Sequence, residues 1–341
     1  MESSMPRRQL QQYSLADSFV KHKAKGNRWL EDIDTVIDWA PVVAVLSKVN
    51  SGSVGARAFP PLTMFKILLL QQWYCLSDEG IEAAVDDRLS FRRFCGFPLD
   101  QAVPDHATIW RLRESLGKLG LAEAAFDALN AQLEHRGLIV RRGTLVDATI
   151  IAAAAAPPNP KTGVVSDVDP DASWTTKNGT STFGYKAHIA VDECSNLIRQ
   201  IEGTSADVYD SQAAAALVQG DEQAFYADKG YDSDDLRRSL KDRGIEPCVM
   251  YKAHRNTPLT TAQTLLNSLF SGPRSAVERS FATMKRHYRL ARVRYFELRR
   301  NQAHFQLVAF AINLKRVLVL EAAAAAATIA QSSGCRWAKC A

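Results

Sequence analysis

The sequence predicts a protein of the α/β class, in which an all-helical N-terminal domain precedes a domain with a mixed five-stranded sheet and helices on its faces. Two observations support this prediction. From residue 30 to 138, apolar side chains recur at helical spacing and strand-like alternation is absent. After Arg141 the pattern becomes a strand, a two-stranded hairpin, a helix, a strand, a helix, a strand and a helix. Such an order is typical of a mixed sheet covered by helices.

The chain divides into four expected segments: a basic flexible arm over residues 1–29, a helical domain over 30–138, the sheet domain over 139–320 and an Ala-rich disordered tail over 321–341. The helices expected in the helical domain cover residues 30–46, 61–74, 78–87, 89–95, 107–116 and 121–136. The strands expected in the sheet domain cover residues 143–151, 183–191, 197–203, 223–227 and 245–251. A polar stretch over 157–182 reads as an exposed excursion, and 252–271 reads as a looser segment.

The composition is that of an ordinary globular chain. Its 341 residues are 46% hydrophobic and 23% charged, which is enough for a sizeable core and fits two domains. The longest apolar run, residues 62–70, contains Lys66 and is too short to cross a bilayer. The six cysteines form no CxxC pair, which argues against a zinc ribbon or a disulfide framework. We therefore expect a cytoplasmic protein with no membrane partner.

Three acids fall on elements that the predicted topology brings together. In a ribonuclease-H-like layout the first and fourth strands are neighbours, so Asp147 within the first would lie beside Asp228 at the end of the fourth. Glu278 lies on an expected helix over residues 273–290 that can pack across the same sheet. On that helix Arg274 and Lys285 stand on the same side as Glu278.

Three converging carboxylates without His or Cys partners suit a hard divalent cation such as Mg²⁺ or Mn²⁺. Two such ions about 3.5–4 Å apart can activate an attacking oxygen and stabilise a leaving oxygen at a phosphodiester. A lone acid in an apolar strand is costly unless it is paired or metal-bound, which favours Asp147 as a ligand of both ions. Each acid also has a simpler interpretation. Asp147 could pair with Lys186 or Arg142, Asp228 could be a turn residue, and Glu278 could be an ordinary surface acid.

A basic run follows the third acid. Between residues 274 and 300 there are nine Lys or Arg residues against two acids, a density that favours a polyanionic partner. The alternative is a solvated helix face. We expect residues 285–300 to hold DNA phosphates without sequence preference, with Lys285, Arg286, Arg289 and Arg292 among the contacts. Arg274 would also hold phosphate or, alternatively, fix the Glu278 carboxylate.

The motifs around the acids resemble a known family. They are Leu-Val-Asp-Ala-Thr around Asp147, Tyr-Ala-Asp-Lys-Gly-Tyr-Asp-Ser around Asp228, and the set Arg274, Glu278 and Lys285. Together they resemble the DDE transposases of the bacterial insertion sequence 5 family, within the insertion-sequence-4-like superfamily. That family's last motif is Tyr, two residues, Arg, three residues, Glu, six residues and Lys, and this chain matches the spacing but has Ser271 in place of the Tyr.

The resemblance implies cut-and-paste transposition of an insertion sequence. A metal-activated water hydrolyses a phosphodiester at the element's end, and the freed 3′-hydroxyl attacks target DNA. It also implies catalytic and metal-binding roles for Asp147, Asp228 and Glu278 with two Mg²⁺ (or Mn²⁺) ions. The expected partners are double-stranded DNA, as terminal inverted repeats and target, and a second copy of the chain, because two ends must be brought together. The alternatives are a metal-dependent nuclease or resolvase of the same fold, and a catalytically idle transposase-derived DNA-binding protein.

Specific DNA ends require an element that reads bases in a groove. The helix after Asp105 is the candidate, within a helix-turn-helix-like domain, and its expected contacts are Thr108 and Arg111, with Trp110 and Arg113 beside them. The alternative is that this helix belongs to the core, since its apolar residues must be buried.

Overall fold

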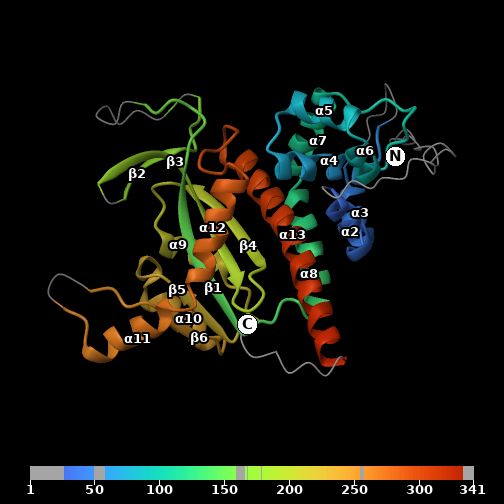
Figure 1. Ribbon diagram of the computed structural model, residues 1–341. Helices are drawn as coiled ribbons and strands as arrows, with labels where there is room; N and C mark the ends of the chain where they lie inside the picture. The colour runs from blue at the N-terminus through green and yellow to red at the C-terminus, as the bar shows by residue number, and fades with distance from the viewer. Residues whose placement is uncertain are drawn as a thin grey trace, which may run out of the picture.

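The computed structural model of the chain describes residues 27–49, 58–158, 166, 168–177, 179–253 and 257–332, with side chains described as far as residue 328 (Figure 1). The basic arm expected over residues 1–29 lies almost entirely outside these residues, as does the end of the expected tail. Within the described part, no helix is both long enough and apolar enough to cross a membrane.

The N-terminal part is helical, as predicted. Its helices are α2 (Arg28–Val36), α3 (Ala40–Leu46), α4 (Pro61–Tyr74), α5 (Asp78–Asp87), α6 (Leu89–Cys95), α7 (His106–Lys118) and α8 (Leu121–His135). The single helix expected over 30–46 is wrong. It is two helices, because the chain is extended at Ile37 and restarts with Pro41 in the first turn of α3. The expected starts of α5 and α7 are confirmed by caps, in which side chains of Ser77 and Asp105 accept first-turn N–H groups.

The sheet has six strands, not the five expected: β1 (Gly143–Ala152), β2 (Ser173–Lys177), β3 (Thr180–Asp192), β4 (Ile198–Ser205), β5 (Ala224–Ala227) and β6 (Glu246–Val249). The order is β2-β3-β1-β5-β6, with β4 also paired to β3. The additional strand β2 comes from the stretch expected to be an excursion, and it lengthens the β3 edge as a hairpin. β1 runs antiparallel to β3 and parallel to β5, so the predicted contact between the first and fourth expected strands is confirmed.

Gly184 stands where β3 passes from its pairing with β2 to its pairing with β4. It pairs with Ala152 of β1 on one side and with Ser173 of β2 on the other. A Cβ at this position would collide with the main chain at Ile151 and Ala153, so the close approach of the strands requires glycine.

The remaining helices are α9 (Asp210–Leu217), α10 (Asp234–Asp242), α11 (Thr261–Ser271), α12 (Ser275–His287) and α13 (Leu298–Ser332), with a 3₁₀ turn, η1 (Lys229–Tyr231), after β5. Three expectations are corrected here. The segment expected to be loose contains α11, which begins with a capping box between Thr260 and Gln263. The helix expected over 273–290 is shorter, with Arg274 as its N-cap. The tail expected to be disordered from residue 321 is helical as far as Ser332, because α13 continues into it.

The helices cover both faces of the sheet (Figure 1). Alternate residues of β1 show this, since Leu145 belongs to the core cluster that contains α12 and α13, whereas Val146 belongs to the cluster formed with α9 and α10. Asp147 therefore faces the α12 side. The long helix α13 packs on β4 and also on α4, α7 and α8, with Phe305 and Phe310 fully buried. It thus joins the helical part and the sheet in one hydrophobic core.

Candidate active site

Asp147 lies in the middle of β1, and Asp228 is the first residue after the parallel strand β5. Val146 of β1 is in register with Ala227 of β5, and each aspartate is the next residue along the chain, so the two lie side by side. Asp228 is the N-cap of η1, and its carboxylate accepts a 2.7 Å hydrogen bond from the Lys229 N–H. The carboxylate of Asp147 accepts a 2.8 Å hydrogen bond from the Ala148 N–H. The turn-residue interpretation of Asp228 is therefore correct locally, but it is incomplete.

One guanidinium joins the two aspartates. Arg274 places Nη2 3.2 Å from Asp147 Oδ2 and Nη1 3.5 Å from Asp228 Oδ1. Its side chain is only 12% exposed, and its buried Nε has no hydrogen-bond partner among the described residues. The alternative pairing of Asp147 with Lys186 is wrong, because Lys186 Nζ binds Asp210 at 2.9 Å. The position between the two carboxylates is thus built for a cation.

The electrostatics of the pair follow from burial and from charge. Burial is the largest effect on the pKa of Asp147 and raises it above the ordinary value, and the neighbouring Asp228 charge adds to the rise. Arg274, Lys177 and the Ala148 N–H act in the opposite direction without cancelling it. Burial also lowers the pKa of Lys285, and the positive charge of Lys177 contributes.

Lys177 is the residue that sequence reasoning missed. It ends β2 and is exposed, yet its charge acts on both Asp147 and Lys285. The signal that could have found it is the alternation of polar β-formers in Ser-Trp-Thr-Thr-Lys, which permits an edge strand.

The third acid stands apart from the other two. Glu278 lies on α12 one turn after Arg274, its side chain is exposed, and it makes no hydrogen bond or ion pair within the described part of the chain. No group of three His, Cys, Asp or Glu side chains among the described residues is close enough to hold a metal ion. The structure therefore brings two of the predicted acids together around a cation and leaves the third on the adjoining helix. Two carboxylates facing one buried cation position are a fitting partial ligand set for a hard divalent ion.

The basic run is partly used inside the protein. Arg292 donates to the carbonyl oxygens of Ala153 (2.8 Å) and Ala154 (3.1 Å). Arg300 Nε lies 2.9 Å from Glu114 Oε1. By contrast, Arg286 and Arg289 are exposed and have no ion-pair partner in the described residues. The solvent-facing charge is thus smaller than the sequence count suggests.

The candidate recognition helix, α7, divides in the same way. Arg111 and Trp110 are exposed and Thr108 is half-buried, so they lie at its outer surface. Arg113 is only 4% exposed and forms two 2.7 Å hydrogen bonds to the carboxylate of Asp78. The expectation that Arg113 lies beside DNA is therefore wrong, because its guanidinium is held in the core.

Comparison with known proteins agrees with this geometry. Residues 139–314 match the family "Transposase DDE domain", and residues 18–115 match "Transposase domain (DUF772)". The first match spans more than half of the chain, so the chain belongs to the transposase DDE domain family. It is a DDE transposase, an enzyme of DNA transposition, and DDE domains generally work with divalent metal ions.

A solved structure with some similarity is described as "Cryo-EM structure of piggyBac transposase synaptic complex with hairpin DNA". It is 10% identical, and the similarity covers 84% of this chain and 72% of that chain with a TM-score of 0.41.

Proposed function

We propose that the chain is an insertion sequence transposase of the insertion sequence 5 type, with Asp147, Asp228 and Glu278 as its catalytic acids in a ribonuclease-H-like domain. The observation that carries this proposal is the Arg274 guanidinium between the two aspartates, which marks a cation position beside the middle of β1 and the end of β5. The helix α12 starts at that position and carries Glu278 one turn further on. A change in the conformation of the Glu278 side chain that brings its carboxylate toward Asp147 and Asp228 would then complete the set of three acids.

With Glu278 turned toward them, Asp147 and Asp228 would hold two Mg²⁺ (or Mn²⁺) ions, which would activate the attacking oxygen and stabilise the leaving oxygen of a phosphodiester. Asp147 would serve both positions, which is supported by its lower exposure, 21% against 38% for Asp228, and by the central place of β1 in the sheet. Arg274 holds the two aspartates in orientation before substrate arrives. Lys177 and Lys285 would supply positive charge to the scissile phosphate, since the charge of Lys177 acts on both Asp147 and Lys285.

On this proposal the substrates are duplex terminal inverted repeats and target DNA, and the active assembly is a dimer holding two ends. The exposed Arg286 and Arg289 contact phosphates, and Thr108 and Arg111 of α7 contact the element end.

The test is a cleavage and strand-transfer assay on a duplex that carries an element end. Asp147→Asn should lower cleavage more than about 100-fold, because replacing even outer-shell partners of metal ligands costs roughly 10–100-fold. DNA binding should stay near the wild-type level. The matched control is Asp242→Asn, an exposed acid at the end of α10, which should cut normally. Unchanged cleavage by Asp147→Asn would refute the site, and cleavage without joining would favour a nuclease.

A further inference from the structure

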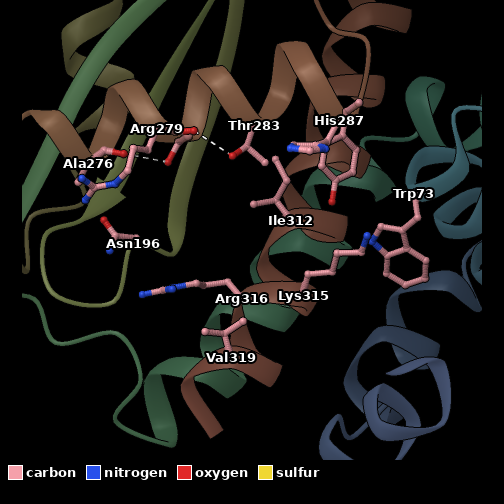
Figure 2. Close-up of a pocket in the computed structure, with 12 residues that line it drawn as sticks. Trp73, Asn196, Ala276, Arg279, Thr283, His287, Ile312, Lys315, Arg316 and Val319 are labelled. Carbon is pink, nitrogen blue, oxygen red and sulfur yellow. Dashed lines mark hydrogen bonds between the residues drawn. The ribbon is translucent and has the colours of Figure 1, made fainter. Parts of the chain in front are cut away.

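A second feature of α12 lies on its other side. A cavity of about 440 Å³ opens between α12 and α13, with Trp73 of α4 at one end (Figure 2). Its lining residues include Trp73, Asn196 and the basic side chains of Arg279, His287, Lys315 and Arg316. None of them is acidic, and none belongs to the proposed catalytic set.

The cavity is lined by basic side chains that lack acidic partners. Arg279, His287, Lys315 and Arg316 form no ion pair within the described part of the chain. Arg316 is nevertheless held in place, because its Nε donates a 2.7 Å hydrogen bond to the Ser195 carbonyl. The other guanidinium nitrogens of Arg316 remain available to a ligand. Positive charge without a counter-ion in a concave site favours an anionic ligand.

The side chains also have a defined arrangement. Figure 2 shows Arg316 extending toward Asn196, while Lys315 extends the opposite way toward Trp73. Lys315 Nζ lies 4.7 Å from the centroid of the Trp29 ring, and partial burial lowers the pKa of Lys315. An anion in the cavity would offset that unfavourable burial.

The cavity and the proposed catalytic site share one helix. Ala276, Arg279, Thr283 and His287 line the cavity at helical spacing, whereas Glu278 is not part of the lining. An α-helix with its side chains is about 10–12 Å across. One DNA strand rises about 3.4 Å per nucleotide, so a strand that touches both sides of α12 spans roughly three nucleotides.

We propose that this cavity is a second contact site for the DNA backbone, in which Arg279 and Arg316 hold about two phosphates of the strand that crosses α12. Lys315 and His287 add positive charge at the other end of the cavity. The proposal rests on the proposed function only in taking α12 as the helix that faces DNA. The site would fix the position of α12, and with it Glu278, relative to the strand being cut.

The experiment measures the affinity for a random-sequence duplex against KCl concentration, in EDTA so that no divalent ion takes part. Each phosphate contact contributes about 0.9 to the slope of log affinity against log salt. The double variant Arg279→Gln, Arg316→Gln should therefore lower the slope by about 1.8, which corresponds to roughly 60-fold weaker binding at about 0.1 M salt. Since Arg316 has a structural hydrogen bond, the single variant Arg279→Glu is measured too. Its side chain is exposed, so the variant should keep its melting temperature and lose affinity.

The matched control is Lys241→Gln, Arg243→Gln at the end of α10, two exposed cations on a helix that packs on the opposite face of the sheet. An unchanged slope in the cavity variants, or an equal loss in the control, would overturn the proposal. The failure of the catalytic assignment is distinguishable, because it would show as normal cleavage by Asp147→Asn. Metal-free binding by Asp147→Asn should equal that of wild type.

Discussion

Replacing Arg274 with Gln tests whether the two aspartates depend on one guanidinium. At an effective dielectric constant of about 20, charges 3.2 Å and 3.5 Å apart attract by about 5 kcal/mol per pair before desolvation is subtracted. Removing one partner of a buried pair costs about 3–5 kcal/mol. The carboxylate side chains here are 21% and 38% exposed, so solvent screens part of this. We expect a net loss of about 2 kcal/mol, or a melting temperature lower by about 4 °C.

The prediction also states how Mg²⁺ changes the melting temperatures of the variant and of wild type. In EDTA the Arg274→Gln variant should melt below wild type, and millimolar Mg²⁺ should restore more stability to the variant than it adds to wild type. An ion at 100 times its dissociation constant adds about 2.7 kcal/mol, and in wild type it must first displace the guanidinium. The assay is thermal unfolding followed by circular dichroism, with direct titration of Mn²⁺ as a second readout.

Two controls make the result specific. Arg286→Gln removes an exposed cation from the same helix and should change neither the melting temperature nor its response to Mg²⁺. Adding Asp147→Asn to Arg274→Gln should recover part of the lost stability, with a coupling energy of about 1 kcal/mol or more. Equal melting of wild type and Arg274→Gln in EDTA, or equal responses to Mg²⁺, would refute the reasoning.

Three further predictions concern stability and activity. Burial lowers the pKa of His188 to about 4 and that of His304 to about 3, so below the ordinary value of 6.5 the unfolded chain binds protons that the folded chain does not. As the pH is lowered from 6.5 to about 4, the free energy of unfolding measured with denaturant should therefore fall by about 1.4 kcal/mol per pH unit for each histidine. A free energy of unfolding that stays constant over this range would contradict the prediction. Breaking the Arg113–Asp78 pair with Arg113→Gln should cost about 3 kcal/mol in the same assay and leave DNA affinity unchanged, whereas a loss of affinity at equal stability would restore Arg113 as a DNA contact. Glu278→Gln should leave the melting temperature unchanged, because its side chain is exposed and unpaired in the described residues, while cleavage falls more than about 100-fold.

Chain order was sufficient to predict the meeting of two acids. Asp147 interrupts an apolar strand and Asp228 ends another, and the only further step was to place the two strands side by side. Both inputs are local patterns or rules of connection, which a single sequence carries. The start of α11 can also be predicted from the sequence, because Thr260 and Gln263 have the spacing of a capping box. The polar composition of the surrounding segment masks this signal.

The pairing of Arg274 with the two aspartates could not be predicted from the sequence in the same way. Helical spacing relates Arg274 to Glu278 on its own helix. It carries no information about Asp147, which is 127 positions away in the sequence. The same holds for Lys177, whose effect on Asp147 exists only because β2 pairs with β3. The cavity beside α12 is formed with α13, the next helix along the chain, and with Trp73 of α4 and Asn196, which are distant in sequence. Pairings of this kind follow from tertiary packing, which the pattern of one chain does not specify.

Repulsion between carboxylates accounts for the outward position of Glu278. Without a divalent ion, a third carboxylate placed about 4 Å from either aspartate would be repelled by about 4 kcal/mol at an effective dielectric constant of about 20. One guanidinium carries a single positive charge, and in this structure it already faces two negative ones. Closure of Glu278 onto the aspartates thus needs more positive charge than Arg274 supplies, and a pair of divalent ions would provide it. Arg274 would then lose the two aspartates as partners, and its guanidinium would bind the phosphate of the DNA strand instead. On the proposed function, one arginine therefore links the filling of the metal site to the holding of substrate.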